Sequence, residues 1–107
     1  MSQSATETSW TSRFVDADGL RTHYLEAGSP TAPPVVLLHG GGAGADAIGN
    51  WHHTIPHLAR THRVIALDMI GFGRTAKPES CEYSQAARNR HLGDFCAALK
   101  LSRAAFV

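Results

Sequence analysis

The feature that most constrains this chain is a run of four apolar residues, Val35 to Leu38, that leads directly into a loop almost without side chains. The loop reads His39-Gly40-Gly41-Gly42-Ala43-Gly44. A continuous apolar strand is typical of a parallel sheet whose two faces are both covered by helices. Ligands of such sheets bind at the carboxyl ends of the strands. The sequence therefore predicts a central parallel strand with a functional loop at its end.

The segments around this strand predict an α/β fold. Asp18-Gly19 between two strand-like segments indicates an antiparallel hairpin at the start. Strands and helices then alternate, which favours a mostly parallel sheet with flanking helices. The expected strands are 13–17, 20–27, 35–38, 64–67 and 104–107, and the expected helices are Asn50 to about Arg60, confined or kinked by Pro56, and a helix N-capped by Ser84 that runs to about Lys100.

The composition of the chain limits the classes of function that it can have. The 107 residues fit one domain, 13–107, after a disordered polar tail, 1–12, that lacks the basic start and apolar centre of a secretion signal. Ten Lys and Arg against nine Asp and Glu, without a basic run, predict no nucleic-acid or membrane partner. Cys81 and Cys96 lack C-x-x-C spacing, which suits a reducing cytoplasm. We expect a cytoplasmic protein that acts on a small molecule.

The glycines after His39 indicate an oxyanion hole. They let a substrate oxygen approach several backbone N–H groups without meeting a side chain. Acyl transfer and hydrolysis need such donors, each of which lowers the barrier by about 3 to 4 kcal/mol. A tight turn alone would need one or two glycines, whereas this loop has four within five positions. The functional interpretation is therefore preferred.

A dinucleotide site is the main competing interpretation. Gly40-x-Gly42-x-x-Ala45 fits the G-x-G-x-x-G/A pattern after a strand, and Asp68 ends the next strand. However, a helix should then begin within the glycine run, whereas the sequence predicts loop from Asp46 to Gly49. An opening hairpin is also unexpected for that fold. Asp68 is instead expected to tie down its own loop.

The histidines predict no metal site. His53 and His57 stand four residues apart on the expected helix with His52 beside them, but no acidic residue completes a ligand set. A solvated or capping role is expected for these three. His62 and His91 stand alone and are expected to be structural.

With these residues identified, the chain resembles the α/β-hydrolase family, and more narrowly the meta-cleavage product hydrolases of bacterial aromatic degradation. VVLLHGGGAG at 35–44 resembles the strand and oxyanion loop, and DMIGFGRT at 68–75 resembles the family turn D-x-x-G-x-G-x-[ST]. The narrower resemblance rests on the three glycines after His39, the loop length to Asn50 and the pair Asn50-Trp51.

The resemblance implies a serine hydrolase that breaks a carbon–carbon bond. In this family a serine attacks a carbonyl carbon of a ketonised 2-hydroxy-6-oxohexa-2,4-dienoate, and the products are a 2-hydroxypenta-2,4-dienoate and a carboxylic acid. No metal or organic cofactor takes part. Carried over by position, Gly41 gives a backbone N–H to the oxyanion hole, while Gly42 and Asn50 hold the oxygen-rich end of the dienoate. Asn50 could also N-cap the expected helix. The family generally self-associates, so a homo-oligomer is expected.

The sequence lacks a G-x-S-x-G nucleophile elbow, and none of its residues can be placed as the triad. We therefore expect a partial α/β-hydrolase domain, truncated a few residues before the serine and inactive alone. Its last strand would be an exposed apolar edge that favours aggregation. An esterase or another serine hydrolase of the same fold, a dinucleotide-binding domain and a non-catalytic piece kept for assembly remain alternatives.

Overall fold

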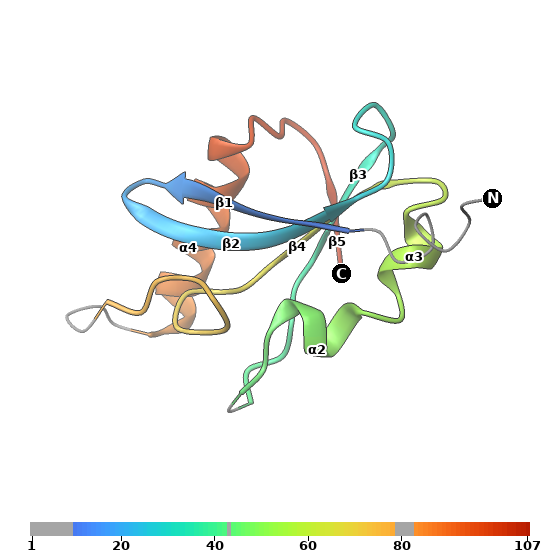
Figure 1. Cartoon of the computed structure of the whole chain (residues 1–107). Helices are drawn as coiled ribbons and strands as arrows, with labels where there is room; N and C mark the ends of the chain where they lie inside the picture. Colours follow the sequence, from blue (N-terminus) through green and yellow to red (C-terminus); the bar gives the residue numbers. More distant parts are fainter. Residues whose placement is uncertain (1–9, 43, 79–82) are drawn as a thin grey trace.

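A five-stranded mixed sheet forms the centre of the molecule (Figure 1). The computed structural model describes residues 10–42, 44–78 and 83–107. The strands are β1 (Thr11–Ala17), β2 (Leu20–Ala27), β3 (Pro34–Leu37), β4 (Arg63–Leu67) and β5 (Ala105–Phe106), in the order β1-β2-β4-β3-β5. The β1–β2 hairpin is antiparallel, β2 is antiparallel to β4, and β3 is parallel to both β4 and β5. The predicted hairpin and mostly parallel α/β sheet are confirmed.

The first strand begins earlier than the sequence predicts. Thr11 pairs with Glu26 and Ser12 with Leu25, so these two residues belong to the sheet and not to a polar tail. β2 is long enough to pair, in the register of the hairpin, with the two residues before Arg13 as well. The predicted boundary at residue 12 is therefore corrected to the start of β1, while residues 1–9 of the expected tail lie outside the described residues.

The helical region between β3 and β4 also differs from the prediction. It consists of two short helices, α2 (Ala47–Trp51) and α3 (Ile55–Leu58), separated by a turn. The N-cap of α2 is Asp46, whose side chain accepts a hydrogen bond from the Gly49 N–H at 2.8 Å. The expectation that Asp46 to Gly49 is loop was wrong, and the alternative role of Asn50 as the N-cap is not observed. The sequence gives little indication of a helix at α2, because α2 is short and contains a glycine.

The long helix α4 (Gln85–Ala98) agrees with the prediction. Ser84 is its N-cap and accepts a hydrogen bond from the Ala87 N–H at 3.1 Å. Phe95 is fully buried and meets Tyr24 edge-on, with ring centroids 5.3 Å apart. Cys96 packs against the same cluster as a free thiol. The apolar stripe of this helix is therefore core packing, as expected.

Two apolar cores lie on opposite faces of the sheet because neighbouring residues of a strand point in opposite directions. The core beneath α2 and α3 contains Leu25, Ala27, Val35, Leu37, Ala47, Ile55, Val64 and Ala66. The core beneath α4 contains Ala17, Tyr24, Val36, Ile65, Leu67, Met69 and Phe95. The sheet is thus the middle of three layers (Figure 1).

Gly28, directly after β2, should tolerate no side chain. Its φ is +87°, and a Cβ there would lie 2.1 Å from the carbonyl oxygen of His62. Gly19 has a similar φ of +90° but open space around it. Left-handed backbone costs an L-residue about 1 to 2 kcal/mol, so Gly19→Ala should lose about that much stability. Gly28→Ala should lose clearly more, because the steric clash is added; equal urea midpoints for the two variants would contradict this.

Candidate functional site

The glycine-rich loop and the turn after β4 lie at the same edge of the sheet because β3 and β4 are parallel. The end of the chain reaches this edge too, since the Leu38 N–H donates a hydrogen bond to the Val107 carbonyl at 2.9 Å. Whatever follows Val107 therefore starts beside the residue that precedes the loop. The glycine loop, the turn after β4 and the end of the chain thus lie at one edge of the sheet, where ligands of α/β sheets bind.

His39 fixes the start of the loop. Its buried ring accepts a hydrogen bond at Nε2 from the Met69 N–H, at 2.9 Å, and therefore carries its proton on Nδ1. Nδ1 lies 2.6 Å from the Gly40 carbonyl oxygen, to which it donates. The ring also meets Phe72 edge-on, with centroids 5.0 Å apart. His39 thus ties the glycine loop to the turn after β4.

Gly41 is exposed at the open edge of the sheet, as an oxyanion donor must be. Within the part of the chain that the structure describes, no group accepts a hydrogen bond from its N–H. Gly42 is also exposed, and its carbonyl oxygen accepts from the Ala45 N–H at 3.0 Å. The backbone donor at Gly41 is therefore available to a ligand oxygen, although its role there stays a prediction.

Asn50 is exposed on the last turn of α2. Its backbone N–H donates to the Asp46 carbonyl oxygen at 3.2 Å. Because Asp46 and not Asn50 caps the helix, the Asn50 side chain is not needed for capping. The substrate-binding role that the resemblance implies for Asn50 and Gly42 stays a prediction.

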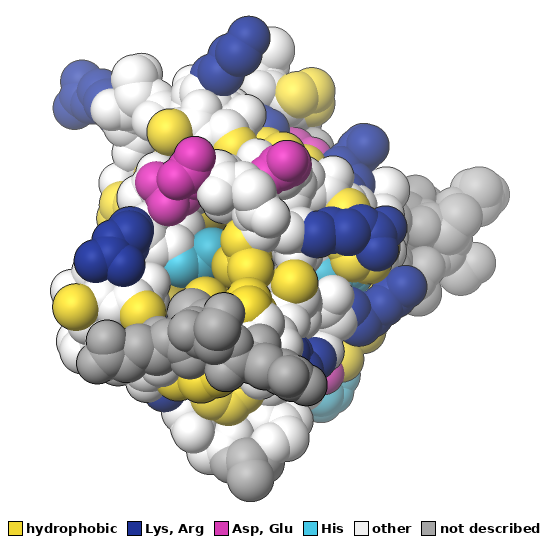
Figure 2. All heavy atoms as spheres, turned by 90° about the vertical axis from the view of Figure 1, so that its left-hand side faces the viewer, with side chains coloured by type: hydrophobic (Ala, Val, Ile, Leu, Met, Phe, Trp, Pro, Cys, Tyr) yellow, Lys and Arg dark blue, Asp and Glu magenta, His cyan; other side chains and the backbone are white. Residues whose placement is uncertain are grey.

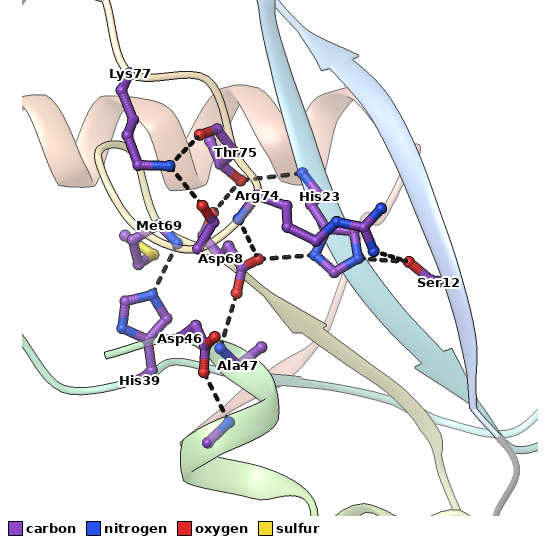
Figure 3. Close-up of polar contacts among 12 residues, drawn as sticks. Ser12, His23, His39, Asp46, Ala47, Asp68, Met69, Arg74, Thr75 and Lys77 are labelled. Atoms are coloured by element: carbon purple, nitrogen blue, oxygen red, sulfur yellow. Dashed lines mark hydrogen bonds and ion pairs between the residues drawn. The ribbon is translucent and has the colours of Figure 1, made fainter. Parts of the chain in front are cut away.

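Asp68 is the centre of a buried network at the end of β4 (Figure 3). Its Oδ1 accepts a hydrogen bond from the Ala47 N–H at 2.8 Å, and its Oδ2 accepts from the Arg74 N–H at 3.0 Å. Its carbonyl oxygen accepts from the Thr75 hydroxyl at 2.6 Å. Asp68 therefore joins the start of α2 to the turn that follows β4. The expectation that Asp68 ties down its own loop is confirmed.

His23 completes this network, and the sequence analysis missed it. Its Nδ1 lies 2.7 Å from Asp68 Oδ2, and both side chains are at most 6% exposed. On the other side of the ring, Nε2 lies 2.5 Å from Ser12 Oγ. The order Ser, His, Asp resembles a catalytic triad, but Ser12 is on β1, at the opposite edge of the sheet from β5. The hydrogen bonds instead link the hairpin to the turn after β4. Among the sequence signals, only the alternation of side chains along β2 could have indicated this role of His23.

His91 is buried and structural, as expected of a lone histidine. Its Nδ1 accepts from the Ile70 N–H at 3.1 Å, so Nε2 carries the proton and donates to Thr22 Oγ1 at 2.9 Å. The Thr22 hydroxyl in turn donates to the Leu20 carbonyl oxygen at 3.0 Å. These contacts need the neutral ring. Burial lowers the pKa of His91, although the nearby Asp94 carboxylate acts in the opposite direction.

This lowered pKa predicts a loss of stability in mild acid. Below the ordinary histidine pKa of 6.5, the unfolded chain binds a proton that folded His91 does not yet bind. The contribution to stability is therefore complete above pH 6.5 and decreases as the pH falls toward the folded pKa. His91→Asn keeps an acceptor for the Ile70 N–H but cannot titrate, so its free energy of unfolding should fall less steeply with acid. Parallel pH curves for the two proteins would contradict the assignment.

A cavity of about 210 Å³ lies between the glycine loop, the turn after β4 and α4. Its lining includes Leu38, His39, Gly40, Phe72 and Arg88. Apolar and polar groups line this cavity at the edge where the glycine loop and the turn after β4 meet. A ligand in the cavity would therefore lie beside the glycine loop.

The described residues include no group of three or more histidine, cysteine, aspartate or glutamate side chains that could hold a metal ion. His52 and His53 stack on each other, His57 is nearby in the sequence, and all three are exposed. His52 Nδ1 lies 2.9 Å from the Ile48 carbonyl oxygen. Cys81 lies outside the described residues.

Lys and Arg side chains are spread over the face drawn in Figure 2, with acidic side chains among them. That face presents no continuous basic patch. Among the described helices, none is both long enough and apolar enough to cross a membrane.

The sheet order, the glycine loop and the turn after β4 together define the class of protein. The sequence model described as the alpha/beta hydrolase fold matches residues 33–107, and the chain belongs to this family. Within it, the chain resembles the meta-cleavage product hydrolases. A 2-hydroxy-6-oxo-6-(2'-aminophenyl)hexa-2,4-dienoic acid hydrolase of Metapseudomonas resinovorans is 57% identical over 93 residues, which cover 87% of this chain and 31% of the relative.

Two further matches agree. A 2-hydroxy-6-oxo-2,4-heptadienoate hydrolase of Pseudomonas putida is 42% identical over 85% of this chain and 32% of its own length. The crystal structure of a serine hydrolase involved in carbazole degradation superposes with a TM-score of 0.86 at 52% identity, over 92% of this chain and 37% of that one. The chain thus spans about a third of the length of the curated relatives it matches.

The dinucleotide interpretation is not supported. The helix after the glycine loop begins at Ala47, earlier than Asn50 but still after the glycine run, whereas a dinucleotide site needs a helix that begins within the run. In a dinucleotide site, Asp68 would also have to bind a ribose hydroxyl. Both of its carboxylate oxygens are already bound by the backbone of the protein. The family match points the same way.

Proposed function

We propose that this chain is the N-terminal part of a hydrolase that cleaves a carbon–carbon bond in 2-hydroxy-6-oxohexa-2,4-dienoate compounds. The observation that carries the proposal is the exposed glycine loop after β3, where no described group accepts a hydrogen bond from the Gly41 N–H. The similarity to relatives that act on such dienoates supports the choice of substrate class.

In the proposed reaction, a serine from the segment after Val107 attacks the carbonyl carbon at position 6 of the ketonised substrate. The carbonyl oxygen becomes negative and is stabilised by a hydrogen bond from the Gly41 N–H. Collapse of this intermediate breaks the carbon–carbon bond and releases 2-hydroxypenta-2,4-dienoate. Water then releases the carboxylic acid from the serine. Gly42 and Asn50 hold the oxygen-rich end of the substrate, where the Asn50 amide offers both a donor and an acceptor.

The coding sequence beyond Val107 tests the origin of the nucleophile. We expect a G-x-S-x-G-like elbow within about ten residues, followed by an acid and then a histidine. β5 already has the parallel pairing with β3 that such an elbow requires. A stop codon directly after Val107 would refute the proposal, because the sequence up to Val107 contains no G-x-S-x-G nucleophile elbow.

A serine esterase of the same fold is the second candidate. It is favoured by the site itself, because the Gly41 N–H would stabilise an ester oxyanion equally well. Faster turnover of simple aryl esters than of dienoates by the complete protein would favour this candidate.

We further infer a cytoplasmic homo-oligomer that acts on a small molecule without a cofactor. The free Cys96 thiol is compatible with a reducing compartment. β5 is an edge strand with Phe106 and Val107 at least half exposed, so the sheet has room to continue beyond it. Size-exclusion chromatography of the complete protein tests the oligomeric state.

A further inference from the structure

Arg88 places a positive charge beside the glycine loop. The residue lies on the first turn of α4 and is half-buried. Its Nη1 lies 3.4 Å from the point where a Cβ on Gly41 would stand, and its Nη2 lies 3.6 Å from the same point. The guanidinium therefore lies against the backbone of the residue that is expected to donate to the oxyanion.

Among the residues that the structure describes, none gives the Arg88 charge a carboxylate partner. Its guanidinium carbon lies 5.6 Å from the centre of the Phe72 ring, which is within the range of a cation–π contact. It lines the 210 Å³ cavity, and no Asp or Glu shares that lining. Among the described residues, no carboxylate lies within 4.0 Å of it as an ion-pair partner. His39, which shares the cavity, carries its proton on Nδ1 only and leaves Nε2 as an acceptor.

We propose that Arg88 is a positioning residue of the oxyanion loop, which holds the Gly41 backbone in place and adds positive charge next to the oxygen that becomes negative. The inference rests on the proposed function. A charge in a partly buried cavity acts more strongly on a developing anion than the same charge in water. The guanidinium lies near both Phe72 and Gly41 before any anion forms, so little reorganisation is needed when it does.

The first test compares Arg88→Met with Arg88→Lys in the complete protein. Methionine keeps the apolar packing on Phe72 and removes the charge, while lysine keeps the charge. Because direct oxyanion donors contribute about 100-fold to 1000-fold, the loss of this indirect charge should lower kcat about tenfold, with little change in KM. The loss should be similar for a dienoate and an aryl ester, since both form an oxyanion. Arg88→Lys should recover most of the rate.

Arg90→Met is the matched control, because Arg90 is an exposed residue on the same helix. It should leave kcat unchanged. An unchanged kcat in Arg88→Met, or equal losses in the methionine and lysine variants, would overturn the role of the charge. A rise in KM for the dienoate alone would overturn it too, because Arg88 would then bind the carboxylate of the substrate.

A second measurement does not depend on turnover. The backbone order parameter of the Gly41 N–H, measured by NMR relaxation, should be lower in Arg88→Met than in the wild type and in Arg90→Met. Equal order parameters in all three proteins would overturn the positioning role. If the wild type turned over neither substrate, the proposed function would fail, while the comparison of order parameters would still decide whether Arg88 positions the loop.

Discussion

Replacing Gly41 with proline is expected to lower the kcat of the complete protein by about 100-fold to 1000-fold, the loss measured when one oxyanion donor is removed. Proline removes the backbone N–H. The fold should survive, because the Gly41 N–H donates to no group within the described residues and the loop is exposed. Steady-state kinetics and thermal unfolding of the same preparation measure the two effects separately.

Gly41→Ala is the matched control for this variant. It keeps the N–H and adds a Cβ that would lie 3.4 Å from Arg88 Nη1, which is an ordinary van der Waals contact. Gly41→Ala should therefore retain most of the kcat that Gly41→Pro loses. If the two variants lost activity equally, the loop would depend on the space at Gly41 and not on its N–H.

Replacing Asp68 with alanine is expected to destabilise the fold by about 3 to 5 kcal/mol, because each buried group that loses its hydrogen-bond partner costs about 1 to 3 kcal/mol. The change leaves His23, the Ala47 N–H and the Arg74 N–H without their acceptor. Urea unfolding of the complete protein measures the loss.

Asp68→Asn separates the contribution of the carboxylate charge to stability from the contribution of the hydrogen bonds. The amide oxygen can still accept one of the backbone hydrogen bonds, but the amide NH₂ replaces an acceptor with a donor. We expect a loss smaller than that of Asp68→Ala. A loss below about 1 kcal/mol in Asp68→Ala would show that solvent replaces the network at little cost, contrary to its burial.

The sequence predicts the sheet well because burial leaves a local signal. The apolar run at Val35 to Leu38 and the Asp18-Gly19 turn each identify their element from a few neighbouring residues. The same holds for α4, where Ser84 caps the helix and its apolar stripe packs on the sheet. In each of these cases the local preference and the tertiary fold agree.

The sequence predicts the short helices and the polar network less well. Asp46 caps α2 only four residues before Asn50, and a five-residue helix shows too little periodicity to be distinguished from a loop. His23 has no local signal at all, because its partners Asp68 and Ser12 are 45 and 11 residues away in the chain. The same applies to Arg88, whose position next to Gly41 depends on how α4 packs across the sheet.

The most direct test of the proposed function is to incubate the complete protein with a 2-hydroxy-6-oxohexa-2,4-dienoate and to identify the products. We expect the dienoate absorbance to disappear, with one 2-hydroxypenta-2,4-dienoate and one carboxylic acid formed for each substrate consumed. A protein that hydrolyses aryl esters but leaves the dienoate unchanged would contradict the proposal of carbon–carbon bond cleavage.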